Sequence, residues 1–134
     1  MPARLWIAFA AALGGLAVAA GAIGAHAIPD ASALAVPIRI FNTGQLYHAL
    51  HALALLGVGI VLYQLEGRRN PMASWLLQIA AAAFLIGILC FSGGIYLQFA
   101  KGFTSSGGIV PFGGIAFIVG WAAFAAGALS LPYK

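Results

Sequence analysis

Four long apolar runs, separated by short polar segments, dominate the pattern of the chain. They cover residues 5–28, 46–63, 75–99 and 110–131. A helix needs about 20 residues to cross the roughly 30 Å hydrocarbon core of a bilayer. Backbone groups in lipid must be bonded within their own segment, and no run alternates with period two, so helices are expected and a β-barrel is not. The pattern predicts an all-α integral membrane four-helix bundle, with residues 1–134 as a single membrane domain.

The connection between the first two runs has a pattern of its own. Residues 29–44 are too apolar for a free loop, and they contain Pro29, Asp30 and Pro37. The Asp30 carboxylate is able to accept hydrogen bonds from the first backbone N–H groups of a short helix. We therefore expect a short amphipathic segment that lies along the outer membrane surface and leads into the second helix.

The first run also resembles part of a signal peptide. It follows "MPAR" and ends in the small residues "AHA", which would suit a cleavage site. Its apolar stretch, however, is longer than the 7–15 residues usual for a signal peptide. We therefore expect an uncleaved first helix.

The composition places the chain in the membrane. It is 63% hydrophobic and 6% charged, whereas an ordinary soluble domain is about 25% charged. The six basic residues are scattered, so they do not form the clustered patch that binds nucleic acid. Cys90 is the single cysteine, which excludes an intrachain disulfide. The lipid bilayer is the partner that the composition indicates.

The basic residues also predict an orientation. Four of them fall on the side of the N-terminus and two on the other side; the four are Arg4, Arg68, Arg69 and Lys134, and the two are Arg39 and Lys101. Cytoplasmic loops carry the excess of Lys and Arg. We expect a multi-pass protein of a cell inner membrane with both termini cytoplasmic.

Small residues recur at four-residue spacing in three of the runs. They are Ala17, Gly21 and Ala25 in the first run, Ala83 and Gly87 in the third, and the two pairs Ala116 with Gly120 and Ala123 with Gly127 in the fourth. This spacing lets membrane helices approach closely. It predicts tight packing within the bundle, with a homo-oligomer interface as the alternative.

The polar side chains of the runs fall toward the predicted outer ends of the helices. His48 and His51 are three residues apart, so they project from one side of the second helix. Polar groups that face lipid are costly, so these side chains should face protein or water. The sequence predicts a small polar pocket at the outer end, formed by His26, Gln45, Tyr47, His48, His51, Ser92 and Tyr96.

Several roles are open to such a pocket. Neutral imidazole binds zinc and copper, but three histidines with no carboxylate beside them make a poor ligand set. The geometry of the two helices would suit a haem held between His26 and a histidine of the second helix, but no haem-binding motif is present in the sequence. Histidines that bond carbonyls and hydroxyls of neighbouring helices are the simplest interpretation, and a proton or substrate role remains the other. We expect no cofactor and no metal.

Catalysis has little support in the sequence. Glu66 and Asp30 fall on opposite sides of the predicted membrane, so they do not form a pair of carboxylates. Ser92 is not part of a nucleophile elbow. Cys90 lies in an apolar run without a positive neighbour, where a thiol stays protonated. We expect a protein that is not an enzyme.

Four ordered motifs carry a family resemblance: "GAIGAHA", "FNTGQLYHALHALALL", "CFSGGIYL" and "VPFGGIAFIVGW". Together they resemble the transmembrane protein 256 family, also called domain of unknown function 423, which consists of small four-helix membrane proteins of bacteria and mitochondria. The resemblance extends from about Leu13 to Leu131. It implies four spans and an uncleaved first helix, and it implies little about activity.

The chain departs from the family pattern at two positions. The third motif more often reads Ser-Gly-Ser, where Gly94 follows Gly93 here, and the fourth often begins Thr-Pro, where Val110 precedes Pro111 here. Each difference removes a hydroxyl from the polar end. The family's motif residues map to Gly21, Gly24, His26, Tyr47, His48, His51, Ser92, Gly93, Tyr96, Pro111, Gly113, Gly114 and Trp121.

The sequence thus favours a non-enzymatic structural or accessory membrane protein, packed against a larger membrane complex or against copies of itself. One alternative is a carrier of small molecules or ions that uses the outer polar pocket. The other is a metal- or haem-binding membrane protein.

Overall fold

The computed structural model describes residues 1–26, 35–67, 70–102 and 108–131, and these residues are almost entirely helical. The helices are α1 (Ala3–His26), α2 (Ala35–Leu65), α3 (Pro71–Gly87), the π-helix η2 (Ile88–Ser92), α4 (Gly93–Ala100) and α5 (Val110–Leu129). Because α3, η2 and α4 follow one another without a break, they form one span, Pro71–Ala100. With α1, α2 and α5 this makes four helices among the described residues that are long and apolar enough to cross a membrane. The predicted all-α membrane fold with four spans is confirmed.

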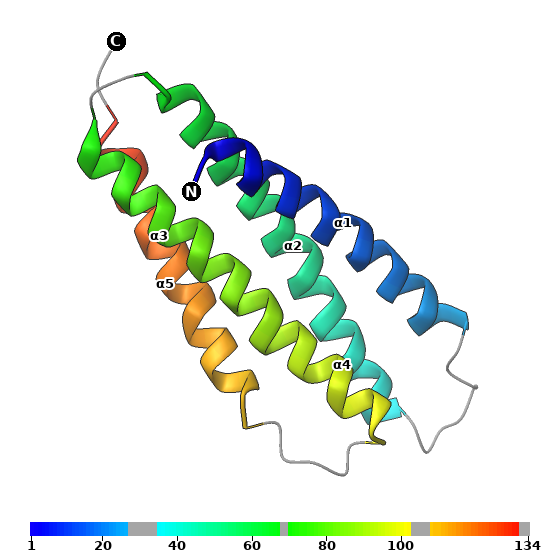
Figure 1. The fold of residues 1–134 in the computed structure, drawn as a ribbon. Coiled ribbons are helices and arrows are strands. Elements are labelled where there is room, and N and C mark those ends of the chain that lie inside the picture. The colour runs from blue at the N-terminus through cyan, green and yellow to red at the C-terminus, as the bar shows by residue number, and fades with distance from the viewer. Residues whose placement is uncertain (27–34, 68–69, 103–107, 132–134) are drawn as a thin grey trace.

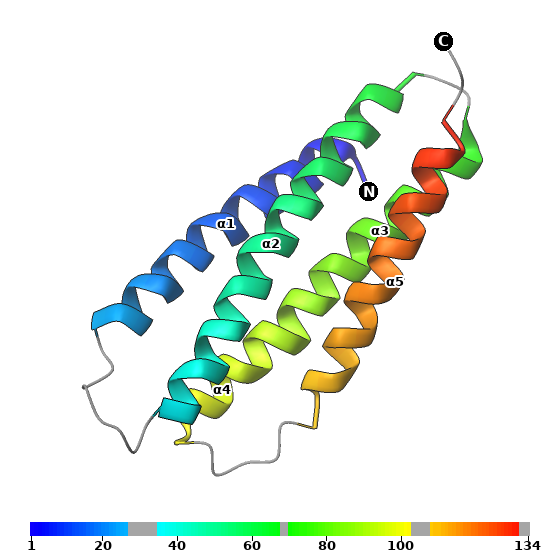
Figure 2. The same ribbon diagram turned by 180° about the vertical axis from the view of Figure 1, so that it is seen from behind.

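The spans pack side by side in the order of the chain (Figure 1). Helix α1 packs on α2, α2 packs on α3, η2 and α4, and α3 packs on α5. The view from behind shows the same order, with α1 and α5 at opposite edges (Figure 2). The core is correspondingly centred on α2 and α3, where Leu55, Val58, Leu77 and Phe84 are fully buried.

Helix α2 begins earlier than the apolar pattern predicts. Its membrane-crossing part runs from Pro37 to Leu65, whereas the pattern predicted a start at residue 46. Residues 35–44 are therefore the first turns of α2, and the expected separate surface segment is wrong for them; residues 29–34, with Asp30, lie outside the described part of the chain. Pro37 is tolerated because the first N–H groups of a helix have no partner within it.

Glycine positions set the distance between α3 and α5. The Phe117 ring lies over Gly87, so a Cβ there would overlap it, and a Cβ at Gly120 would lie 2.6 Å from the Phe84 ring. Near the C-terminal end of α5, a Cβ at Gly127 would lie 3.0 Å from Leu77. Since large side chains from each helix fill the space over glycines of the other, the predicted tight packing is confirmed for this pair.

The π-helix η2 is where α5 comes closest to the third span. The N–H of Gly93 bonds to the carbonyl of Ile88, five residues earlier, which widens this turn. A Cβ at Gly113 would overlap the backbone of Phe91, with 2.8 Å to its Cα. Only glycine at position 113 allows this backbone contact, and it places η2 beside the first turns of α5.

Candidate functional site

Both ring nitrogens of His51, on α2, make hydrogen bonds. Its side chain is 5% exposed. Its Nδ1 lies 2.8 Å from the Tyr47 carbonyl, one turn earlier on α2, and its Nε2 accepts a 3.2 Å hydrogen bond from Trp121 Nε1 on α5. The indole N–H is a donor only, so Nε2 is unprotonated and Nδ1 carries the proton. The two bonds define a neutral imidazole that connects α2 with α5.

Aromatic rings hold this imidazole from both neighbouring helices. The ring stacks on Phe117, with centroids 3.5 Å apart and an angle of 14° between the planes. Phe84 of α3 lies 5.7 Å away, and the same ring meets Trp121 edge-on at 5.1 Å. Such offset and edge-on pairs add to the free energy of burial. The His51 ring is therefore fixed in position before any ligand binds.

His48 faces a different neighbour. Its Nδ1 lies 3.2 Å from the Tyr96 hydroxyl on α4, and its side chain is 4% exposed. Its Nε2 has no hydrogen-bond partner among the described residues; the backbone of Leu13 on α1 interacts with the ring, outside hydrogen-bond geometry. The Ser92 hydroxyl is also buried and without a partner in the described part of the chain.

The residues of the predicted outer pocket contact several different helices. Gln45 donates a 3.3 Å bond to the Ala17 carbonyl of α1, and His26 is exposed at the end of α1. His48 bonds to Tyr96 of α4 and His51 bonds to Trp121 of α5. These side chains make separate contacts between pairs of helices, and a common pocket stays a prediction.

Helix α5 has 20 residues, about the length that crosses the hydrocarbon core, and Trp121 lies near its middle. The imidazole bonded to Trp121 therefore lies beside the middle of α5 rather than beside one of its ends.

A groove lies between α2 and α5 next to His51. Its volume is about 790 Å³. Its lining residues include Tyr47, His51, Phe91, Gly114, Phe117 and Trp121. These residues come from α2, η2 and α5, so the groove crosses from one helical hairpin to the other.

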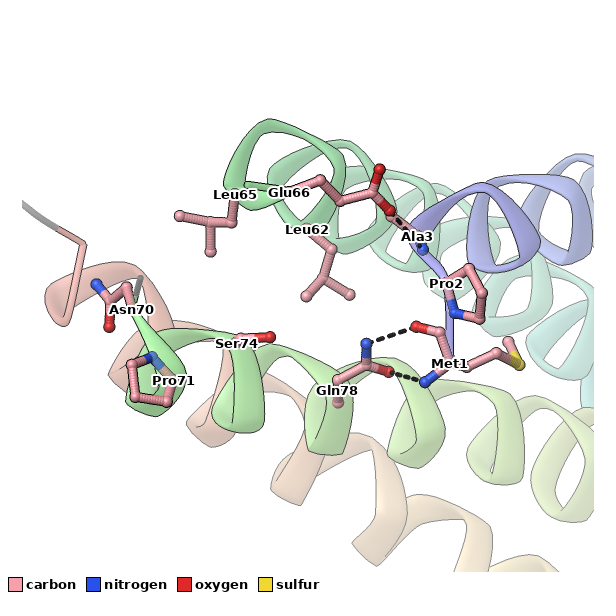
Figure 3. Close-up of a pocket in the computed structure, with 10 residues that line it drawn as sticks. All are labelled: Met1, Pro2, Ala3, Leu62, Leu65, Glu66, Asn70, Pro71, Ser74 and Gln78. Atoms are coloured by element: carbon pink, nitrogen blue, oxygen red, sulfur yellow. Dashed lines mark hydrogen bonds between the residues drawn. The ribbon is translucent and has the colours of Figure 1, made fainter. Parts of the chain in front are cut away.

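A second polar cluster, which the sequence did not predict, joins the helix ends on the side of the N-terminus (Figure 3). Gln78 Oε1 accepts a 2.7 Å bond from Trp6 Nε1 and a 3.3 Å bond from the Met1 amino group, while Gln78 Nε2 donates to the Met1 carbonyl at 2.7 Å. Glu66 accepts from the Ala3 N–H at 3.3 Å, at the start of α1. A glutamine inside a long apolar run was the signal in the sequence.

Asn70 belongs to the same end of the bundle. Its Oδ1 accepts from the Ala73 N–H at 3.2 Å and caps α3, and its Nδ2 donates to the Ser130 carbonyl at 2.8 Å. A pocket of about 450 Å³ lies beside Glu66, Asn70 and Gln78. At this end, α1, α2, α3 and α5 are thus joined by uncharged and charge-assisted hydrogen bonds.

Metal ligation is not apparent in this geometry. Among the residues that the structure describes, no three His, Cys, Asp or Glu side chains lie together as a metal site would need. Both ring nitrogens of His51 already take part in hydrogen bonds. Cys90 is a half-buried free cysteine in η2.

Comparison with known proteins identifies relatives along the whole chain. A family model described as "Protein of unknown function (DUF423)" matches residues 20–114. The UPF0382 inner membrane protein YgdD of Escherichia coli K12 is 33% identical over 135 residues, which cover 100% of this chain and 96% of the relative. The UPF0382 membrane protein YwdK of Bacillus subtilis is 36% identical over 111 residues, 79% of this chain and 80% of the relative.

A staphylococcal relative gives the same result. The UPF0382 membrane protein SSP2132 of Staphylococcus saprophyticus is 31% identical over 106 residues, 79% of this chain and 81% of the relative. No solved structure matches the chain significantly.

Proposed function

We propose a structural role for this chain, which belongs to the DUF423 family of small inner-membrane proteins. It acts as a non-enzymatic accessory protein that packs in the bilayer against a larger membrane complex. Its own four spans form the folded unit, and the lipid-facing side of α1 contacts the partner.

The exposed side of α1 is the observation that carries this proposal. Small residues form a stripe along it, at successive spacings of four and three: Ala8, Ala12, Gly15, Ala19 and Ala22, all exposed. The opposite side of the same helix is buried against the rest of the chain through Trp6, Ala10, Leu13 and Ala17. Helix α1 therefore has one face for α2 and a second face of small residues, which is the surface that membrane helices use for close association.

The polar residues support the same role. Gln45, His48 and His51 make hydrogen bonds between helices of the chain: to Ala17 of α1, Tyr96 of α4 and Trp121 of α5 respectively. Such bonds stabilise helix association in membranes by about 0.6 kcal/mol each on average. Side chains already engaged in this way favour packing over chemistry.

The proposed orientation has both termini in the cytoplasm. Four spans place both ends of the chain on one side, and that side carries Arg4, Arg68, Arg69 and Lys134. Arg39, in the first turns of α2, and Lys101, directly after α4, lie at the other end of the bundle. The excess of four basic residues over two supports the inner side for the termini.

Co-purification with a matched pair of variants tests the accessory role. The wild-type protein is extracted from its own membrane in a mild detergent, and co-eluting chains are identified by mass spectrometry. Ala12→Leu adds bulk to the α1 stripe, whereas Ala125→Leu makes the same change on the exposed side of α5. We expect a stoichiometric partner with the wild type and Ala125→Leu, and its loss with Ala12→Leu.

Three results would contradict the proposal. One is a partner that stays bound to Ala12→Leu and leaves with Ala125→Leu. Another is an assembly that contains only copies of this chain. The third is a wild-type peak that carries no second chain at any detergent concentration that keeps the protein folded.

A further inference from the structure

The groove between α2 and α5 has the properties of a ligand site. Its volume of about 790 Å³ lies within the range of roughly 300–1,000 Å³ that is usual for small-molecule sites. It lies away from the α1 stripe, because α1 and α5 are at opposite edges of the fold (Figure 2). A ligand in this groove is therefore independent of the accessory role of α1.

Aromatic rings line this groove and contact one another. Tyr47 lies 5.0 Å from Phe91 and 6.1 Å from Phe117, and Phe91 meets Phe117 edge-on at 5.7 Å. Phe117 is held in turn by its stacking on His51. Rings from α2, η2 and α5 thus form a preformed surface whose geometry suits another flat ring, since aromatic pairs favour stacked and edge-on contacts.

The charge of the groove selects an uncharged ligand. No Asp, Glu, Lys or Arg is among its described lining residues, and the hydrogen bonds of His51 define a neutral imidazole. A charged molecule would lose its hydration at this depth without gaining a counter-ion.

One hydrogen-bond donor in the groove is unused. Tyr47 is 40% exposed, and its hydroxyl bonds to no residue in the described part of the chain. Its ring lies at the level of Phe91 and Phe117, inside the spans, where an unpaired hydroxyl is costly. A carbonyl oxygen on a bound molecule would accept this hydrogen bond.

The outer rim of the groove opens to the hydrocarbon of the bilayer. Leu50, Leu53 and Ile118 lie on this rim and are 50%, 66% and 71% exposed. A molecule reaches the rings from the lipid, and an apolar tail attached to it stays among the acyl chains.

We propose that the α2/α5 groove binds an uncharged, membrane-soluble molecule with a flat ring, a carbonyl acceptor on that ring, and a hydrocarbon tail. The ring lies against Phe91 and Trp121, with the buried Phe117 behind them, and the carbonyl accepts a hydrogen bond from Tyr47. Isoprenoid quinones have this chemistry and serve as the probe.

Tryptophan fluorescence measures the binding directly, because Trp121 lines the groove. The full chain is placed in phosphatidylcholine nanodiscs in a Trp75→Phe background, which removes the tryptophan that is 71% exposed at the inner end and leaves the buried Trp6. Ubiquinone with a two-isoprene tail is titrated in. We expect saturable quenching with about one quinone per chain.

Three variants locate the site. A Cβ at Gly114 would lie 3.9 Å from the Phe91 ring, so Gly114→Leu fits the backbone and fills the groove, and it should abolish the saturable phase. Gly15→Leu makes the same change on the exposed side of α1, with no atom near its Cβ, and should bind as the wild type does. Tyr47→Phe keeps the ring and loses the hydroxyl, and should bind roughly three- to tenfold more weakly.

Other occupants give other results, and each would overturn the proposal. Quenching that rises linearly with quinone and is equal in Gly114→Leu and Gly15→Leu means that the probe only partitions into lipid. Quenching of Trp121 by brominated acyl chains that quinone does not relieve means that a phospholipid tail fills the groove. A dimer that becomes a monomer in Gly114→Leu means that a second copy covers it. Tyr47→Phe also keeps the test decisive if Gly114→Leu fails to fold.

Discussion

The adjacent glycines Gly113 and Gly114 should respond oppositely to the same substitution. In Gly113→Ala the new methyl group would overlap the backbone of Phe91, at 2.8 Å from its Cα and 2.7 Å from its Cβ. Neither atom belongs to the end of a flexible side chain, so α5 and η2 must move apart. In Gly114→Ala the nearest described atom is 3.9 Å away, an ordinary van der Waals contact.

The magnitudes follow from this geometry. Overpacking of a well-packed interior costs about 1–3 kcal/mol, and a backbone contact that is unable to relax falls at the upper end of that range. Replacement of a helical glycine by alanine contributes about 0.5–1 kcal/mol in the opposite direction. We expect Gly113→Ala to lower the free energy of unfolding by about 2 kcal/mol, and Gly114→Ala to leave it unchanged or raise it slightly.

Reversible unfolding in mixed micelles, with a rising mole fraction of sodium dodecyl sulfate and circular dichroism as the signal, measures both variants against the wild type. The two alanines are neighbours on one helix turn, so effects of composition and helix propensity cancel between them. Equal stabilities for the two variants would refute the close contact between α5 and η2. A larger loss in Gly114→Ala would place the wrong glycine at the contact.

The same unfolding assay tests the polar contacts. Gln78→Leu should lower the free energy of unfolding by about 1–3 kcal/mol because it leaves the buried indole N–H of Trp6 unpaired. Gln64 is exposed near the C-terminal end of α2, so Gln64→Leu should cost less than about 0.5 kcal/mol. Similar losses in the two variants would contradict a bonding role for Gln78. Trp121→Phe should cost about 1–2 kcal/mol by leaving His51 Nε2 without a donor, and a loss unchanged in a His51→Phe background would show that the bond contributes nothing. Asn70→Ala should cost about 1 kcal/mol through the lost cap of α3, and an unchanged midpoint would rule that cap out.

The sequence predicted the spans better than their ends. Length and apolar character alone identify four membrane helices, because a bilayer imposes a minimum length on each. The start of α2 was missed since Arg39, Asn42 and Thr43 interrupt the apolar pattern there, and Pro37 reads as a break. A proline in a first helical turn breaks nothing, so the helix extends outward past the apolar run.

The candidate site was predictable residue by residue and not as an arrangement. His48, His51 and Tyr96 do bond to other helices or to their own backbone, as polar groups in a membrane must. Which helix each one meets depends on the order in which the spans pack, and periodicity within one helix carries no information about that order. The pairing of His51 with Trp121 therefore required the structure.

The wide turn at η2 changes the rotational phase of the third span. A turn that closes over five residues holds one residue more than an α-helical turn, so α4 is rotated by about 100° from the direction that α3 would give it. The part of the span before η2 presents Phe84 to α5, and the part after it presents Ile95 and Tyr96 to Gly44 and His48 of α2. One continuous span thus packs against two neighbours on different sides. Deletion of a single residue within Ile88–Ser92 would turn Ile95 and Tyr96 away from α2 while leaving the contact of Phe84 with α5 in register.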